Sequence, residues 1–198
     1  MTYKIAITGG FGTGKSTAGE ILVSLGYKVI DTDEIVHKIL SLDTKTIKQI
    51  ASIFGDEVLD VDQTINRKAL ARIVFSDVQK KKELEGILHP MVKKAIFDLC
   101  TLFIDEKFIF VLIPLLFEAS MDNDFDEIWC VSCSRENQIL RLGLKGFTLE
   151  EIEKRNSMQM PLVEKEEYSD FVLNNDKAKI HLQSQIEKRI QELKHRLN

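Results

Sequence analysis

The chain has 198 residues, 44% of them hydrophobic and 29% charged, and a formal net charge of −4 at pH 7. This length and composition are typical of a globular protein with a sizeable core, and the negative charge gives no reason to expect nucleic-acid binding as the main activity. The longest apolar run, residues 108–117, is interrupted by Pro114 and too short to span a membrane. No N-terminal signal peptide is recognisable, so we expect a cytoplasmic protein without membrane or nucleic-acid partners.

The first predicted elements are a buried strand at residues 3–8 and a helix at residues 16–25, joined by a glycine-rich turn. The turn fits the pattern G-x-x-x-x-G-K-[ST] over residues 9–16. Glycines let such a loop turn its backbone N–H groups toward phosphate oxygens, and a helix N-terminus favours the same anion. Lys15 would then contact the β- and γ-phosphates, and the Ser16 hydroxyl would ligate Mg²⁺. The residues predicted to bind ATP here are Gly10, Gly12, Thr13, Gly14, Lys15, Ser16 and Thr17.

The second predicted strand, residues 27–30, leads into two acids, Asp31 and Asp33. Ligands of open α/β sheets bind at the carboxyl ends of the strands, so these acids are expected near the nucleotide. They could accept the proton of an attacking hydroxyl and hold Mg²⁺ through water. Alternatively they cap a following helix, because Asp and Thr favour that position and apolar residues follow. Both interpretations hold if the two acids divide the roles.

A long segment of helical character precedes the third predicted strand, residues 107–113. That strand is continuously apolar, which fits a central parallel strand covered on both faces. The segment before it contains predicted helices at 44–54, 67–75 and 79–103, the last with Pro90 inside. An insert at the carboxyl edge of the sheet is a natural place for an acceptor-binding domain.

Two further strands, at 127–132 and 170–173, complete a predicted five-stranded sheet. Charged helices at 135–145 and 148–159 lie between them, and an amphipathic helix over residues 180–193 closes the chain. Strands that alternate with helices predict an α/β fold with a central, mainly parallel sheet.

Two of the three cysteines, Cys130 and Cys133, have the C-x-x-C spacing of a metal or redox pair. No second pair exists to complete a zinc site, and residues three apart in a strand point to opposite faces. Cys100 lies in an apolar stretch. We therefore interpret all three as small buried hydrophobic residues and assign them no function.

Three short motifs, LHP (88–90), PLLFE (114–118) and DFVLNN (170–175), carry no function by spacing alone. Together with the glycine loop, VIDTDEI, INRKALARIVFSD, QILRL and RNSMQM, in this order, they resemble the dephospho-coenzyme A kinase family. The resemblance extends from residue 5 to residue 175. It implies transfer of the ATP γ-phosphoryl group to the ribose 3′-hydroxyl of dephospho-CoA, the last step of coenzyme A synthesis, with Mg²⁺ as cofactor.

The resemblance also implies a P-loop three-layer fold with a helical acceptor-binding insert and a lid. The nucleotide-binding core would comprise residues 1–34, 105–134 and 168–198, the CoA-binding insert residues 35–104, and the lid residues 135–167. The partners implied are ATP and dephospho-CoA, and we expect a monomer or a small homo-oligomer.

Site residues follow from their positions in the family motifs. Asp33 matches the proposed base near the acceptor hydroxyl, Arg141 matches the lid arginine that approaches the phosphates, and Asn175 falls in the adenine-side loop. The catalytic residues implied are therefore Asp33, Lys15 and Arg141, and the acceptor-binding residues are Asp33, Arg67, His89 and Leu116.

Two positions depart from the family pattern. Some members carry an acid two residues before the proline of PLLFE, where this chain has Leu112. Support for Mg²⁺ would then come from Ser16, the phosphates, water and the two aspartates. The lid sequence RLGLKGFT lacks a second arginine, and Lys145 would stand in for it, keeping the charge but losing the planar fork.

Other interpretations of the glycine loop remain open. A kinase of the same fold could act on a nucleoside monophosphate, although the helical insert and the LHP and PLLFE motifs argue against it. A GTP-dependent switch protein needs an N-K-x-D motif, and the NNDK of this chain has the wrong order. A nucleotide-binding module without catalysis does not explain two acids beside the loop.

Overall fold

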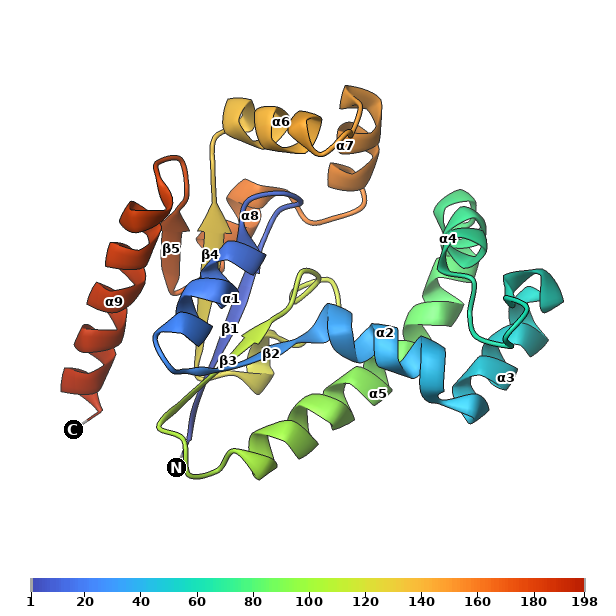
Figure 1. The fold of residues 1–198 in the computed structure, drawn as a ribbon, viewed down its shortest axis with the longest axis horizontal. Coiled ribbons are helices and arrows are strands. Elements are labelled where there is room, and N and C mark those ends of the chain that lie inside the picture. The colour runs from blue at the N-terminus through green and yellow to red at the C-terminus, as the bar shows by residue number, and fades with distance from the viewer. Residues whose placement is uncertain (1, 198) are drawn as a thin grey trace. The chain divides into compact units, whose positions relative to one another are not determined.

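The computed structural model describes residues 2–197, apart from the side chain of Phe75, and has a five-stranded parallel sheet flanked by helices (Figure 1). The strand order is β2-β3-β1-β4-β5. The strands are β1 (Tyr3–Gly9), β2 (Lys28–Asp31), β3 (Phe108–Leu112), β4 (Glu127–Ser132) and β5 (Phe171–Asn174). Each agrees with a predicted strand to within one residue at either end, so the predicted α/β fold is confirmed.

The helices account for most of the remaining chain. They are α1 (Lys15–Ser24), α2 (Thr32–Leu42), α3 (Thr44–Phe54), α4 (Arg67–Ser76), α5 (Val78–Leu102), α6 (Arg135–Leu144), α7 (Leu149–Asn156), α8 (Leu162–Glu167) and α9 (Lys179–Arg196), with 3-10 turns at Asp56–Val58 and Asp122–Asp124. The predicted helix 148–159 ends at Asn156, and α8 is not predicted at all. Its sequence, LVEKEE, is short and mostly charged, so it carries no apolar periodicity that could indicate a helix.

The chain divides into two compact units, one formed by residues up to Ile30 and from Leu102 onward, the other by Asp31–Thr101. The first contains the sheet with α1 and α6–α9, and the second contains α2–α5. The finer division into core, insert and lid remains a prediction.

The first unit is layered because successive residues of a strand face opposite sides of the sheet. Ile5 and Ile7 of β1 belong to a core cluster that α1 and α9 complete with Leu22 and Ile186. The opposite face of β1 and β4 is covered by α8 (Figure 1). All five residues of β3 are buried, as expected for a central strand. The sheet is therefore held rigidly between helices, with its carboxyl edge leading into the glycine loop.

A buried carboxylate lies at the opposite, amino edge of this sheet. Glu127 begins β4, is only 2% exposed, and accepts hydrogen bonds from Trp129 Nε1 (2.6 Å), Arg189 Nε (3.0 Å) and Arg196 Nη2 (2.7 Å). Burial by itself would raise the pKa of Glu127, but the hydrogen bonds from Arg189, Trp129 and Arg196 outweigh it and hold the pKa below its usual range.

Glu127→Gln is therefore expected to lower the free energy of unfolding at pH 7 by about 2–4 kcal/mol, because Arg189 loses its buried carboxylate partner and keeps only the more exposed Glu192, 3.0 Å from its Nη1. Since the folded-state pKa lies below the unfolded one, the contribution is complete above the unfolded pKa of roughly 4.3 and is lost as the pH falls through the folded value. Urea unfolding at pH 7 and at decreasing pH below about 4 should show the two proteins converging in acid. Equal stability at pH 7 would contradict the assigned role.

The second unit, Asp31–Thr101, has a core of its own. Its buried residues are Leu40, Ile47, Ile50, Phe54, Val58, Ile65 and Leu70. Polar side chains begin three of its helices: Asp31 accepts from the N–H of Asp33, Asp43 from that of Thr46, and Asn66 from that of Ala69. Helix α2 thus begins where the cap interpretation of Asp31 predicts.

Two of the three cysteines are buried as predicted, Cys130 and Cys133, whereas Cys100 is only half-buried. None of the three forms a disulfide. Burial raises the pKa of the Cys130 thiol to about 12, so this thiol is uncharged at neutral pH. Among the described residues no group of histidine, cysteine and acidic side chains is arranged to hold a metal ion.

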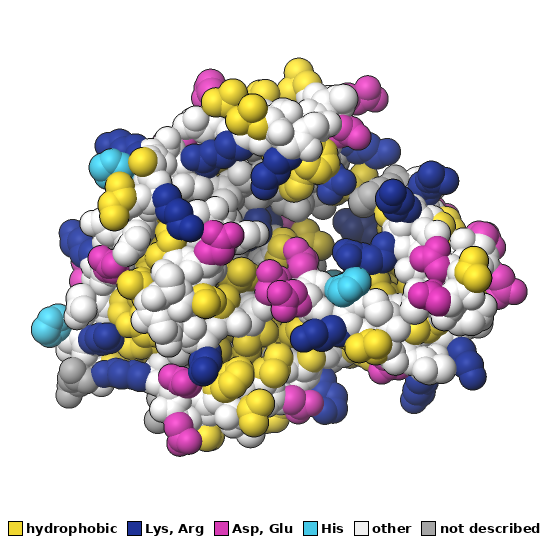
Figure 2. All heavy atoms as spheres, in the orientation of Figure 1, with side chains coloured by type: hydrophobic (Ala, Val, Ile, Leu, Met, Phe, Trp, Pro, Cys, Tyr) yellow, Lys and Arg dark blue, Asp and Glu magenta, His cyan; other side chains and the backbone are white. Residues whose placement is uncertain are grey.

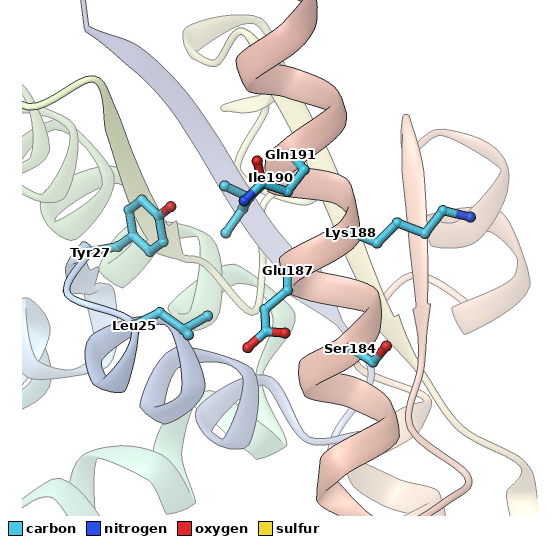
Figure 3. A pocket seen from close by; sticks show the side chains of 7 residues that line it. All are labelled: Leu25, Tyr27, Ser184, Glu187, Lys188, Ile190 and Gln191. Carbon is cyan, nitrogen blue, oxygen red and sulfur yellow. The ribbon is translucent and has the colours of Figure 1, made fainter.

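A surface hollow of about 510 Å³ lies beside α9 in the first unit (Figure 3). Leu25 and Tyr27, from the turn after α1, face Glu187 and Ile190 of α9 across it. The hollow contains no residue of the glycine loop. Within residues 2–197, no helix combines the length and apolar character required to cross a membrane.

Candidate active site

The glycine loop joins β1 to α1, and its close packing explains which glycines it needs. Gly12 and Gly14 have φ of +74° and +111°, a region that residues with a Cβ rarely adopt. A Cβ on Gly14 would lie 2.0 Å from Asn175 Nδ2, and one on Gly12 would lie 2.7 Å from Leu142. The glycines therefore serve two purposes, the turn itself and the close approach of residues from α6 and from the loop after β5.

The predicted phosphate-binding side chains lie at the start of α1. Lys15 Nζ donates hydrogen bonds to the carbonyl oxygens of Gly9 (2.8 Å) and Gly10 (2.7 Å), which places its ammonium group against the loop. Ser16 is exposed in the first helical turn, and Thr17 follows half-buried. Because the first turn of α1 contains no acidic residue, its free N–H groups remain suited to an external anion.

Asn175 and Arg141 are packed directly on this loop. Asn175 is 6% exposed, and its Nδ2 donates to the carbonyl oxygen of Thr13 at 2.8 Å. Arg141 Nη2 donates to the carbonyl oxygen of Asn175 at 2.5 Å. Arg141 Nη1 is buried without a hydrogen-bond partner among the described residues, so a strong donor beside the loop remains available to an acceptor such as a phosphate oxygen. The structure thus brings Lys15, Arg141 and Asn175 together around one loop.

Helices α6 and α7 contact the tip of the loop through residues for which the sequence predicted no individual role. Gln138 Nε2 donates to the carbonyl oxygen of Phe11 at 2.5 Å. The Phe11 and Phe147 rings pack edge to face at 5.2 Å, and the Arg155 guanidinium lies within 5.0 Å of both ring centres. Figure 2 shows basic side chains gathered around these two helices. Each of these residues lies in a sequence motif: Gln138 in QILRL, Phe147 in RLGLKGFT, Arg155 in RNSMQM and Phe11 in the glycine loop. None of the motifs indicated that the four residues meet.

Asp176 fixes the start of α6. Its Oδ1 accepts from the N–H of Ser134 at 2.7 Å and from Asn137 Nδ2 at 2.8 Å. These hydrogen bonds, that of Asn137 first, hold the pKa of Asp176 well below its usual range. The loop after β5 therefore anchors both the glycine loop, through Asn175, and the base of α6. Lys145, at the end of α6, is exposed one turn after Arg141, and its role remains a prediction.

The remaining predicted residues lie at the start of α2 and in the second unit. Asp31 Oδ1 accepts from the N–H of Asp33 at 2.9 Å, so Asp31 is the cap, and Asp33 is exposed in the first helical turn. Arg67, at the start of α4, lies 3.4 Å from His37 Nδ1, a histidine that was not predicted for the site. His89 is half-buried in α5, immediately before Pro90.

Two residues around PLLFE bear on the predictions for that motif. Leu116 has no exposed surface, which argues against the predicted contact between its side chain and the acceptor. Its contribution is to pack the segment into the core. Leu112, where some family members carry an acid, is 6% exposed and packs so closely on α1 that a Cβ on Gly19 would lie 2.8 Å from its Cδ1. An acid at this position would lose a core contact.

Comparison with known proteins identifies the family. A model of the dephospho-CoA kinase family matches residues 3–181. A dephospho-CoA kinase from Gloeobacter violaceus is 38% identical over 93% of this chain and 89% of its own length. Another, from Lactobacillus johnsonii, is 36% identical over 98% of this chain and 99% of its own. The chain belongs to the dephospho-CoA kinase family.

A solved structure agrees with this assignment. The dephospho-CoA kinase from Campylobacter jejuni is 31% identical, with a TM-score of 0.73 over 98% of both chains. Membership of the dephospho-CoA kinase family confirms the predicted activity, ATP-dependent phosphorylation of dephospho-CoA in coenzyme A biosynthesis. The roles of individual residues remain predictions.

Proposed function

We propose that the enzyme transfers the γ-phosphoryl group of ATP to the ribose 3′-hydroxyl of dephospho-CoA at the glycine loop. The observation that carries this proposal is the packing of Arg141 and Asn175 on a loop that already holds Lys15. Phosphoryl transfer depends mainly on neutralising charge and on in-line positioning, and these groups supply positive charge and hydrogen-bond donors at one place.

The geometry supports the following roles for these residues. The loop N–H groups and Lys15 would hold the β- and γ-phosphates, and Arg141 would stabilise the negative charge that develops during transfer. Asn175 would shape the adenine side of the site. We propose Arg67 and His89 as acceptor-binding residues, because the helical unit that contains them follows directly on the second strand.

Mg²⁺ is the proposed cofactor: Ser16 would help to hold it, and it would supply positive charge that neutralises the phosphates. The exposed hydroxyl of Ser16 in the first turn of α1 suits such an ion. Within the described residues there is no cage of acidic and histidine ligands, which fits an ion held mainly by phosphates and water. Asp33 would support it through water. A cytoplasmic location and a monomer or small homo-oligomer remain predictions.

The proposal is tested by a coupled ADP-release assay with ATP and Mg²⁺, comparing dephospho-CoA with AMP and adenosine as acceptors. We expect turnover with dephospho-CoA and product carrying a 3′-phosphate by NMR, little turnover with the shorter acceptors, and loss of activity in EDTA that Mg²⁺ restores. ADP release at the same rate without any acceptor, or phosphate at another hydroxyl, would contradict the proposal.

Asp33→Asn should lower kcat by about 10²–10³-fold, because the amide keeps the shape and a hydrogen bond but cannot accept a proton. The effect falls at the lower end of general-base contributions because a loose transition state demands little deprotonation before transfer. The matched variant is Asp31→Asn, whose amide oxygen still accepts from the N–H of residue 33, so its loss should be smaller. ATP affinity should survive in both. A larger effect at Asp31 than at Asp33 would show that the base is assigned to the wrong acid.

A further inference from the structure

A buried ion pair outside the predicted site joins α8 to the PLLFE segment. The Lys165 side chain has no exposed surface, and its Nζ lies 2.9 Å from Glu118 Oε1. The same ammonium group donates to the carbonyl oxygen of Pro114 at 2.7 Å. Glu118 Oε1 also accepts from the N–H of Met160 at 2.8 Å. A charge removed from water in this way is tolerated only because it is paired and hydrogen-bonded.

The pair fixes the segment 114–118 at both of its ends. Pro114 and Glu118 bracket this segment, which begins two residues after β3 at the carboxyl edge of the sheet. One ammonium group that contacts both ends sets the path of the turn between them. The N–H of Met160 is bound by the same carboxylate, so the stretch between α7 and α8, within the predicted lid, is tied to this turn as well.

Helix α8 connects this turn to the glycine loop. It packs on β1 and β4, and Ser132, the last residue of β4, hydrogen-bonds to Glu166. At its start, Leu162 lies beside the glycine loop, where a Cβ on Gly10 would be 3.7 Å from Leu162 Cδ1. Lys165 therefore reaches the segment 114–118 from a helix that is itself fixed to the loop and the strand ends.

Stability does not explain why an ion pair occupies this position. Buried ion pairs can often be replaced by apolar residues of similar volume without loss of stability. Here the arrangement also leaves Glu118 Oε2 buried without a hydrogen-bond partner among the described residues, which is unfavourable. An apolar contact has no preferred direction, whereas the Lys165 ammonium group makes directional contacts at two fixed points of one turn, the Pro114 carbonyl and the Glu118 carboxylate.

We propose that Lys165 and Glu118 are positioning residues, which hold the segment 114–118 in a fixed relation to the glycine loop so that the acceptor hydroxyl meets the γ-phosphate in line. This inference rests on the proposed function. Misplacement of reacting groups by about 1 Å can lower the rate roughly 10²-fold. Because the pair would position the acceptor and not the nucleotide, its loss should lower the rate of transfer more than the affinity for ATP.

The test compares Lys165→Met, Glu118→Gln and the double variant with the wild type, in the ADP-release assay and in urea unfolding. Both single variants should lose stability, and Lys165→Met should lower kcat/KM for dephospho-CoA by about 10- to 100-fold while the KM for ATP stays within about 3-fold. In the double variant stability should recover, because neither charge is left unpaired, but activity should not, because the Pro114 carbonyl still lacks its donor.

Glu127→Gln is the matched control, since it breaks a buried ion pair of the same unit at the amino edge of the sheet. It should lose stability with unchanged kinetic constants. Recovery of activity together with stability in the double variant would overturn the inference, as would unchanged kinetics in Lys165→Met. If Lys165→Met does not fold, the nearly isosteric Glu118→Gln tests the inference instead. We expect it to lower kcat/KM for dephospho-CoA by about 3- to 10-fold, and wild-type kinetics would contradict the inference. A wild type that fails to phosphorylate dephospho-CoA would remove the proposed function instead.

Discussion

Replacing Lys15 by alanine is expected to lower kcat by at least about 10³-fold, the largest single effect we predict for this enzyme. Its ammonium group lies against the glycine loop, 2.8 Å and 2.7 Å from the carbonyl oxygens of Gly9 and Gly10. There it can stabilise the negative charge that develops on the β–γ bridging oxygen as ADP leaves. No other side chain of the loop carries a positive charge that could do this. Single-turnover kinetics with saturating ATP and dephospho-CoA would measure the loss directly.

The control for Lys15 comes from the same strand and loop region. Lys4 is also half-buried, and its Nζ donates to the carbonyl oxygen of Asp124 at 2.9 Å, but it lies at the amino end of β1. Lys4→Ala should therefore cost a similar, small amount of stability and leave kcat unchanged. If Lys15→Ala retained wild-type turnover, the assignment of residues 9–16 as the phosphate site would fail.

Arg141→Ala is expected to lower kcat by about 10³-fold, while KM for dephospho-CoA changes much less. The buried Nη1 beside the loop is a charge-assisted donor, and a donor used mainly in the transition state appears in kcat rather than in KM. Because Nη2 also holds the carbonyl of Asn175, the variant should loosen the adenine side and raise KM for ATP moderately. Steady-state kinetics with each substrate varied would separate these effects.

Two variants of the same helix sharpen this test. Arg141→Lys keeps the charge but cannot hold the Asn175 carbonyl and a phosphate at once, so it should recover only part of the rate. Arg135 starts the same helix and contacts Glu153 and Gln138, and it reaches the glycine loop only through Gln138, so Arg135→Ala should lower kcat far less than Arg141→Ala. Unchanged kcat in Arg141→Ala, with only a lower Tm, would mean that Arg141 serves to hold the Asn175 carbonyl and has no part in catalysis.

Much of the sheet and the glycine loop could be predicted because their signals are local. A strand buried on both faces is continuously apolar, and a phosphate loop needs glycines, a lysine and a hydroxyl at fixed spacing whatever surrounds it. The cap at Asp31 is local as well, because a side chain two residues away satisfies the N–H of Asp33. The sequence alone therefore determined the fold class and the glycine loop between β1 and α1, while the nucleotide site at that loop stays a prediction.

Only the tertiary structure decided which side chains around the PLLFE segment are buried and what they contact. Lys165 stands in the charged run Glu164–Glu167, a pattern typical of a solvated helix, yet its side chain is completely buried. Leu116, predicted to contact the acceptor, is packed into the core. Burial of this kind depends on which strands and helices meet, and α8 meets the turn after β3 through a contact between distant parts of the chain. Periodicity and motifs cannot reveal such a partner. The interactions that make burial of the Lys165 charge possible are with Glu118 and the Pro114 carbonyl, which are distant in sequence.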